Sequence, residues 1–330
     1  MEKEYCAYIS KIHNLNEEIH KSFEFIRYRN SIKNDSTIFI KPNFTFPFYK
    51  QGITTNPLVL QHLLGLLKDK ADRVIVGESD GGNRSFTADQ AFKGHGMYEI
   101  CKATGAELVN LSTIPAETVK GTIQGISVKV QLPKMLLNDI DCFISVPVLK
   151  VHVMTTVTLS MKNLWGCYPD TMRCLHHKYL SRKLTLITKS LNPQLILIDG
   201  TYALDGHGPM YGTPIHTNLI ISANNPVVAD ALGSAVMGIP LIKVDHILMA
   251  QKEGLGSTDL SKITINEDWK QYSRRFNVSK TIIDNFSWIL FNSETCAKCV
   301  MDSPFTPLIY KIGTKLRNKD EQNVSDQMKK

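Results

Sequence analysis

The sequence predicts an α/β protein: a largely parallel sheet with helices on both faces, followed by an irregular or helical C-terminal extension. Short runs that are apolar throughout, such as "STIFI" (36–40), alternate with stretches at helical spacing, such as "PLVLQHLLGLLKDK" (57–70). Strands that are apolar on both faces are typical of parallel sheets buried between helices. The alternation stops after about Gly256, which predicts an α/β domain over 1–256 and an extension with a disordered basic tail over 257–330.

The elements follow in chain order. The N-terminal "MEKEYCAYISKIHNLNEEIHKSFEF" is charged and helical in pattern. Strands are predicted over 36–40, 73–76, 106–111, 142–146, 194–198 and 218–222. Helices are predicted over 57–70, over 87–105 with Gly94 and Gly96 as weak points, and over 225–239 with Pro226 in the first turn. "VKGTIQGISVKVQLP" (119–133) alternates apolar and polar residues and predicts a hairpin.

Composition narrows the class of protein. Of 330 residues, 43% are hydrophobic and 21% are charged, which is the balance of a globular protein with a sizeable core. No apolar run is long enough for a transmembrane helix, and the N-terminus has no apolar signal segment, so a cytosolic protein without membrane contact is expected.

The net charge of +7 suits a small anionic partner. No basic stripe interleaved with aromatics is present, so nucleic-acid binding is not expected. The sequence does not establish the oligomeric state.

The seven cysteines are expected to be thiols, because their number is odd and no secretion signal precedes them. Only "CAKC", with Cys296 and Cys299, has the spacing of metal ligands. "CYPDTMRCLHH" (167–177) gathers two cysteines and two histidines, but a loop with incidental thiols is the favoured interpretation.

Ionisable and amide side chains follow four of the predicted strands. The residues at these positions are Lys41, Asn43, Glu78, Lys150, His152, Asp199, Asp205 and His207. In open α/β sheets ligands bind beyond the carboxyl ends of the strands. A shared pocket is therefore predicted, with Lys41, Glu78, Lys150 and His152 lining one cleft; the alternative is a set of solvated loop residues.

The stretch "VPVLKVHVMTTVTLSMKNLWG" (146–166) carries the strongest signal. Lys150 and His152 are two residues apart, so they point to the same side of an extended chain. If 155–166 is helical, Thr155, Thr158 and Lys162 share a face, and the helix N-terminus offers free N–H groups beside Lys150 and His152. The pattern predicts an anion site.

In order, "IKPNF", "VGES", "PVLKVH…MKNLWG", "LIDG" and "NNPVVADALGSAVMG" resemble the motifs of the DUF362 family, bacterial and archaeal proteins named for lacking an assigned function. The resemblance covers about residues 36–256, and the K-x-H…K-N-x-x-G block is its most specific part. It implies a common α/β domain and a common pocket, but no reaction. Some relatives carry a ferredoxin-like four-cysteine module; here only Cys296 and Cys299 are in register, so an iron–sulfur cluster is not implied.

The first functional hypothesis is an enzyme acting on a small anionic substrate, a carboxylate or a phosphate, with a divalent metal as a candidate aid. His152, Lys150, Lys162 and Glu78 are the catalytic candidates, with His152 as general acid or base. Lys41, Asn43, Asn163 and Asp199 are the substrate-binding candidates. The candidate metal ligands are Asp205, His207, Cys296 and Cys299.

Two alternatives remain open: an iron–sulfur or other metal-binding redox protein, and a non-catalytic binding protein. A Walker loop and a Rossmann G-x-G-x-x-G are both absent, so the sequence gives no sign of nucleotide hydrolysis or dinucleotide binding. The sequence names no cofactor and no reaction.

Overall fold

The computed structural model describes residues 4–279 and shows a layered α/β fold. Within that range a ten-stranded sheet runs through the molecule in the order β12-β1-β11-β10-β7-β2-β3-β4, with β8 and β9 beside β10. Its strands are β1 (Cys6–Lys11), β2 (Thr37–Pro42), β3 (Arg73–Glu78), β4 (Glu107–Asn110), β7 (Cys142–Val146), β8 (Val148–His152), β9 (Thr156–Val157), β10 (Leu195–Asp205), β11 (Thr213–Ala223) and β12 (Thr264–Ile265). A separate hairpin joins β5 (Ala116–Ile123) to β6 (Ile126–Pro133) and confirms the hairpin predicted there.

The sheet is largely parallel, as predicted. The neighbours β10, β7, β2, β3 and β4 all pair in parallel, and β8 pairs with β10 in the same sense. Strand β11 pairs antiparallel with both β10 and β1. The carboxyl ends of β2, β3 and β7 therefore meet at one edge of the sheet.

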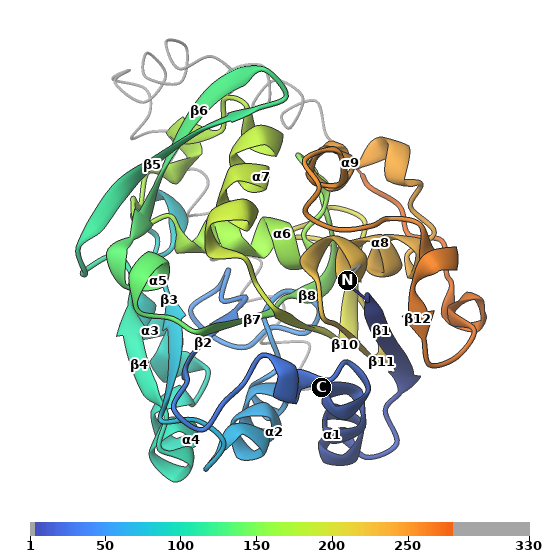
Figure 1. Cartoon of the computed structure of the whole chain (residues 1–330), viewed down its shortest axis with the longest axis horizontal. Coiled ribbons are helices and arrows are strands. Elements are labelled where there is room, and N and C mark those ends of the chain that lie inside the picture. Colours follow the sequence, from blue (N-terminus) through green and yellow to red (C-terminus); the bar gives the residue numbers. More distant parts are fainter. Residues whose placement is uncertain (1–3, 280–330) are drawn as a thin grey trace, which may run out of the picture.

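Helices cover both faces of the sheet, which also confirms the predicted fold class (Figure 1). One face carries α1 (Leu15–Phe25), α2 (Pro57–Leu67), α3 (Ala88–Gly94) and α4 (Met97–Thr104), and the other α6 (Leu159–Asn163), α7 (Leu180–Leu191), α8 (Pro226–Val236) and α9 (Asp245–Lys252). The short α5 (Lys134–Asn138) follows the hairpin. Separate apolar cores lie on the two faces: α1, α2 and α4 pack on one, while α8 with α9, and α7 with the hairpin, pack on the other.

Local sequence explains where these helices begin and end. Asn225 caps α8 through its side chain, which accepts hydrogen bonds from Val227 N and Val228 N. The predicted helix over 87–105 is divided into α3 and α4 at its glycines. A Cβ on Gly94 would lie 1.9 Å from Pro47 O, and Gly96 has a φ of +67°, so both positions favour glycine.

Two sequence predictions need correction. The N-terminal segment is not helical throughout: residues 6–11 form β1, because the buried run "CAYI" pairs with β11 at the inside of the sheet. The helix predicted over 155–166 is also shorter. Only Leu159–Asn163 is α-helical, since Thr156 and Val157 pair with β8 as β9.

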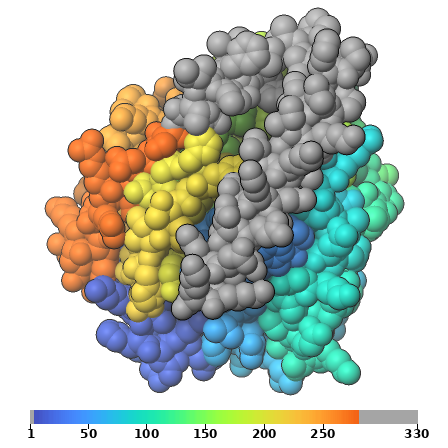
Figure 2. Space-filling view, turned by 180° about the vertical axis from the view of Figure 1, so that it is seen from behind, coloured from blue at the N-terminus to red at the C-terminus, as the bar shows by residue number. Residues whose placement is uncertain are grey.

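Residues 257–279 lie against the α/β layers. Strand β12 extends the main sheet beside β1, and Phe276 is buried in the apolar core under α8. Seen from behind, these orange residues lie beside the yellow β10–β11 region (Figure 2). The predicted domain boundary at 256 stays a prediction. Cys296, Cys299 and the predicted basic tail lie outside the described residues.

Candidate functional site

A cavity of about 360 Å³ opens where β2, β3 and β8 end. Seven of the predicted site residues line it: Lys41, Asn43, Glu78, Lys150, His152, Lys162 and Asn163. These residues follow different strands in the sequence, but they meet at one edge of the sheet, as expected for residues at the carboxyl ends of parallel strands. The four residues of the predicted cleft, Lys41, Glu78, Lys150 and His152, are among them.

The floor of the cavity holds a buried ion pair. Lys41 Nζ lies 2.5 Å from Glu78 Oε2, and the two side chains are 1% and 6% exposed. Lys41 Nζ also donates to Pro42 O, and Glu78 accepts from the backbone N–H groups of Phe44 and Ser79. A buried pair with these added partners is held in one geometry and joins β2 to β3.

Gly166 lies against this ion pair, which explains the glycine in "MKNLWG". A Cβ at this position would lie 2.9 Å from both Glu78 Oε1 and Lys41 Nζ. Gly166→Ala is therefore expected to displace the pair and to lower the free energy of unfolding by about 1–3 kcal/mol, as other overpacked sites do. Urea unfolding of the variant measures this loss. Gly65→Ala is the matched control, because a Cβ on that helical glycine meets nothing within 4 Å.

Lys150 and two amides form a second buried network. Lys150 Nζ donates to Asn43 Oδ1 (2.8 Å), Thr45 Oγ1 (3.2 Å) and Ile53 O (2.6 Å). Asn43 Nδ2 donates to Asn163 Oδ1, and Asn163 Nδ2 donates to Lys41 O. Burial and the charge on Lys162 hold the pKa of Lys150 well below its usual range. Protein partners therefore satisfy Lys150 and both amides, which makes this network a frame for the cavity.

His152 lies on β8 with its ring fixed in one tautomer. The backbone N–H of Met154 donates to His152 Nδ1 at 3.1 Å, so the neutral ring carries its proton on Nε2. Burial, together with the charges on Lys162 and Lys150, holds the pKa of His152 well below its usual range. His152 is thus a neutral hydrogen-bond donor.

Lys162 differs from the other two lysines of the cavity. Across residues 4–279 its amine makes no ion pair and no hydrogen bond, whereas Lys41 and Lys150 are both fully engaged. Burial, aided by the positive charge of Arg173, lowers the pKa of Lys162 to about 7. Near neutral pH this amine therefore exists in both its charged and its neutral form.

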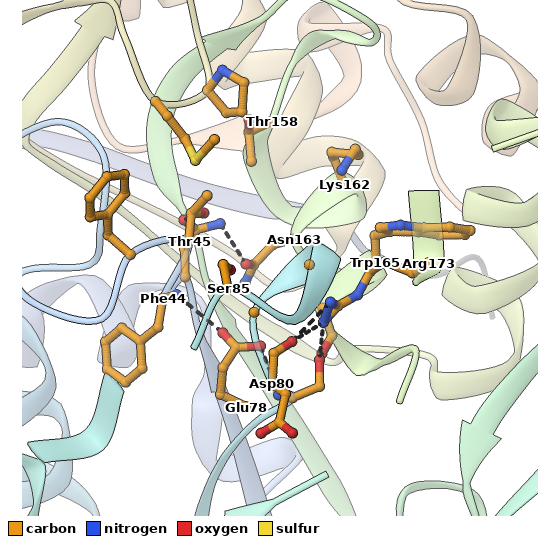
Figure 3. A pocket seen from close by; sticks show the side chains of 18 of the residues that line it. Phe44, Thr45, Glu78, Asp80, Ser85, Thr158, Lys162, Asn163, Trp165 and Arg173 are labelled. Atoms are coloured by element: carbon orange, nitrogen blue, oxygen red, sulfur yellow. Dashed lines mark hydrogen bonds between the residues drawn. The ribbon is translucent and has the colours of Figure 1, made fainter. Parts of the chain in front are cut away.

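Further polar groups around Lys162 also lack partners. Thr158 Oγ1, Trp165 Nε1, Arg173 Nε and His177 Nδ1 are all buried atoms of the cavity lining without a hydrogen bond in the described structure. Thr158, Trp165 and Arg173 are 3%, 4% and 9% exposed. Figure 3 shows Lys162, Trp165 and Arg173 together on one side of the cavity, with Phe44 and Thr45 on the other. Buried polar groups are costly when unpaired, so the clustering of the Trp165 and Arg173 N–H donors with the Thr158 hydroxyl indicates a place for an acceptor-rich ligand.

Sequence reasoning did not find Arg173. Its guanidinium donates to Ser79 Oγ (2.6 Å) and to Asp80 O through both terminal nitrogens, which fixes it between the β3 loop and the 3-10 turn Arg173–His176. It sits in "CYPDTMRCLHH", which was considered only as a source of metal ligands. A single arginine in a loop has no spacing signal, so only the fold brings it to the cavity.

The prediction that a helix N-terminus offers free N–H groups beside Lys150 and His152 is wrong. The free N–H groups of α6 belong to Ser160 and Met161, and both donate to the carboxylate of Asp230 on α8, at 2.7 and 2.9 Å. Burial raises the pKa of Asp230 to about 8, against the opposing effect of these two hydrogen bonds. Asp230 therefore occupies the helix end and positions the segment that carries Lys162.

The backbone before Lys162 is strained. Thr156 and Leu159 have φ values of +68° and +43°, which β-branched and bulky side chains rarely adopt. Thr156 Oγ1 is anchored on Lys243 O at 2.8 Å. Backbone strain of this kind concentrates at functional sites, where the surrounding contacts hold it in place.

Three predicted site residues do not line the cavity. Asp199 is buried and accepts from Asn56 N and from both Thr201 N and Thr201 Oγ1, so it joins α2 to β10. Asp205 accepts from Gly206 N and Asn277 N. The ring of His207 lies 6.2 Å from that of Tyr211. Between residues 4 and 279 no three His, Cys, Asp or Glu side chains form a group that could hold a metal ion.

The segment 167–177 is held by ordinary contacts. His176 Nε2 lies 2.9 Å from Asp170 Oδ2, and Cys174 Sγ donates to Asn83 Oδ1. Burial raises the pKa of Cys167 to about 12, so its thiol is unreactive. The interpretation of this segment as a loop with incidental thiols agrees with these contacts.

Comparison with known proteins places the chain in a family without an assigned activity. The thylakoid-associated protein sll1697 of Synechocystis sp. is 28% identical over 127 residues, which are 36% of this chain and 40% of that relative. The match thus spans less than half of the relative's length. A crystal structure of a Thermotoga maritima protein has 9% identity and a TM-score of 0.35, covering 56% of this chain and 49% of that one. No helix within residues 4–279 is long and apolar enough to cross a membrane. The family model "Domain of unknown function (DUF362)" matches residues 38–235, more than half of the sequence, and the chain therefore belongs to the DUF362 family.

Proposed function

We propose that this protein is an enzyme that binds a small anion, a carboxylate or a phosphate, in the cavity at the carboxyl ends of β2, β3 and β8. One observation carries the proposal. Lys162 Nζ, Trp165 Nε1, Arg173 Nε and Thr158 Oγ1 line the same cavity, and none has an acceptor in the described structure. A bound anion supplies several acceptor lone pairs at once and satisfies these groups together.

The carboxylates of the cavity lining are engaged elsewhere, which leaves the charge near Lys162 uncompensated. Glu78 pairs with Lys41, and Asp80 Oδ1 accepts from Ala88 N and Asn110 Nδ2. Figure 3 shows the Asp80 carboxylate directed away from Lys162 and Arg173. The side of the cavity that holds Lys162 and Arg173 is thus positive, and it attracts an anion whenever Lys162 is protonated.

The catalytic role of the site is supported by His152 and Lys162. A neutral histidine with its proton on Nε2 can hydrogen-bond to a reacting carbonyl oxygen and polarise it. The Lys162 amine, with a pKa of about 7, can give or take a proton near neutral pH. Lys41, Asn43 and Asn163 hold the frame in which these groups are placed.

Anion binding is tested by thermal and calorimetric titration of the full chain with phosphate, sulfate, acetate and oxalate at constant ionic strength. We expect at least one anion to raise the unfolding temperature in a saturable way, since a ligand at 100 times its Kd stabilises by about 2.7 kcal/mol. Binding should weaken above pH 7, because Lys162 then loses its charge. If no anion stabilises the protein more than chloride does, the proposal is wrong.

Thr158→Val separates binding from folding. The hydroxyl of Thr158 has no partner among residues 4–279, so the variant is expected to unfold within about 1 kcal/mol of wild type. Anion affinity should fall about 10–150-fold, because a hydrogen bond to a charged group contributes about 1.5–3 kcal/mol. Calorimetry and urea unfolding on the same preparations measure the two effects.

The matched control is Thr188→Val, whose hydroxyl donates to Leu184 O inside α7, away from the cavity. This variant should lose a little stability and keep its anion affinity. Equal affinity in wild type and Thr158→Val would remove Thr158 from the site.

We also propose that the protein works in the cytosol on a small molecule, without nucleic acid or membrane as partner. The five cysteines within residues 4–279 are all free, which suits a reducing compartment. Vesicle co-sedimentation of the full chain tests whether it binds a membrane. This test is of interest because one relative is named as thylakoid-associated.

A further inference from the structure

Lys162 is placed for covalent chemistry in a way that Lys41 and Lys150 are not. Lys41 is held by Glu78 and Pro42 O, and Lys150 is held by three acceptors, so the lone pair of neither amine is accessible to a ligand. Lys162 makes no such contact within the described residues, and it lines the cavity. Of the three cavity lysines it alone has an amine that a ligand can approach without first breaking a protein contact.

The groups around Lys162 favour its neutral form. Trp165 Nε1 and Arg173 Nε are unpartnered donors, and Arg173 is cationic. Next to these two donors a neutral amine offers a lone pair to them or to an electrophile, which an ammonium cannot do. Burial and the charge of Arg173 lower the pKa of Lys162 to about 7, in agreement with this arrangement. Desolvation beside another cation is a known way to activate a lysine nucleophile.

From this geometry we propose that Lys162 forms an imine with the carbonyl carbon of a 2-oxo carboxylate. The proposal rests on the proposed function, because it takes the carboxylate as the anion that Arg173, Trp165 and Thr158 bind. A carbonyl next to that carboxylate is then presented to the Lys162 amine. Anchoring one end of the substrate in this way turns a bimolecular addition into a reaction within the complex.

The step balances without an oxidant or a metal. The Lys162 nitrogen adds to the carbonyl carbon, a C–N bond forms, and the carbonyl oxygen takes a proton to give a carbinolamine. A second proton converts this hydroxyl into water, which leaves as the C=N bond forms and the nitrogen loses its remaining hydrogens. The two hydrogens that the neutral amine loses end on the leaving water, and we assign to the Nε2–H of His152, which lines the same cavity, the hydrogen bond that polarises the carbonyl oxygen.

The opposite wall selects the rest of the substrate. Phe44, Phe46, Pro47, Phe86 and Met210 line the cavity with apolar and aromatic surface. Figure 3 shows Phe44 across the cavity from Lys162 and Arg173. A ligand that spans the cavity therefore places a carboxylate at the positive side and an apolar group at the aromatic wall. We assign a 2-oxo acid with an aromatic or branched side chain as the preferred substrate class.

Reductive trapping tests the imine on the full chain. The protein is incubated at pH 7 with phenylpyruvate or pyruvate and cyanoborohydride, and the modified lysines are identified by peptide mass spectrometry. Lys162 should be labelled first. A surface lysine with a pKa near 10.4 is about 10³-fold less often neutral at this pH. Phenylpyruvate should label at lower concentration than pyruvate.

Trp165→Phe with formaldehyde as a second reagent separates substrate recognition from general amine reactivity. The variant keeps an aromatic ring but loses the indole N–H, so labelling by phenylpyruvate should fall several-fold while labelling by formaldehyde stays unchanged. His152→Gln should slow phenylpyruvate labelling, because it removes the imidazole N–H but keeps a polar side chain. Phenylpyruvate labelling of Trp165→Phe at the wild-type rate, with formaldehyde labelling also unchanged, would overturn the assignment.

The two proposals fail in different ways. If anions stabilise the protein but Lys162 is labelled no faster than surface lysines, the imine is wrong and the anion site stands. If Lys162 is labelled by formaldehyde but no 2-oxo acid or other anion binds, both the imine substrate class and the proposed function are wrong.

Discussion

Replacing Lys41 with methionine is expected to lower the free energy of unfolding by about 3–5 kcal/mol, because Glu78 then keeps a buried charge without its partner. The two side chains are 1% and 6% exposed, and the pair joins β2 to β3 below the cavity. Glu78→Gln should cost a similar amount, since it leaves the Lys41 ammonium buried. Urea unfolding followed by circular dichroism measures both losses.

The double variant Lys41→Met/Glu78→Gln is the control for this prediction. It removes both charges, and the single glutamine oxygen still accepts from one of the two backbone N–H groups that Glu78 binds through its two oxygens, Phe44 N or Ser79 N. The double variant should therefore lose less stability than the sum of the two single variants, which is the signature of direct coupling. Additive losses would show that the pair is not coupled in the folded protein.

The free energy of unfolding of the wild-type protein should rise with pH between about 7 and 10, because Lys162 has different pKa values in the folded and unfolded states. Burial lowers the pKa of Lys162 to about 7 in the folded protein, whereas a lysine in the unfolded chain titrates near 10.4. In this window the unfolded chain binds the extra proton, so the free energy of unfolding rises by up to about 1.4 kcal/mol per pH unit. Below pH 7 both states are protonated and the contribution is constant.

Lys162→Met isolates this effect from its charged neighbours. Arg173, Lys150, His152, His177 and His246 face the amine and titrate or carry charge in both proteins. The variant should be more stable than wild type at pH 6.5, and the difference should shrink steadily by pH 9.5. A difference that does not change with pH would mean that Lys162 titrates normally and is solvated.

The fold was predictable where the sequence has a strong period. The runs around Ile40 and Ile144 are apolar on both faces, and they form parallel strands at the inside of the sheet. The N-terminal strand was missed because charged residues on both sides of "CAYIS" hide a short run whose pairing partner lies more than 200 residues away, in β11. Such long-range pairing overrides local pattern.

The site was predictable to the extent that it follows strand ends. Lys41, Glu78 and Lys150 come directly from β2, β3 and β8, so the parallel sheet brings them together. Arg173 was missed because a single arginine in a loop has no spacing signal, and Asp230 because it reaches α6 from a distant part of the chain. The prediction of free N–H groups at the helix end failed for this second reason: the carboxylate of Asp230, nearly 70 residues further along the chain, already accepts from Ser160 N and Met161 N.

The central claim is that the partnerless donors beside Lys162 bind an anion. The most direct test is a crystal structure of the full chain soaked in selenate at pH 6, with anomalous data to locate the selenium. The account predicts an anion within hydrogen-bond distance of Lys162 Nζ and Trp165 Nε1, and its loss in crystals of Lys162→Met. Selenate bound only on the protein surface, with the cavity between Lys162, Trp165 and Arg173 holding only water, would contradict it.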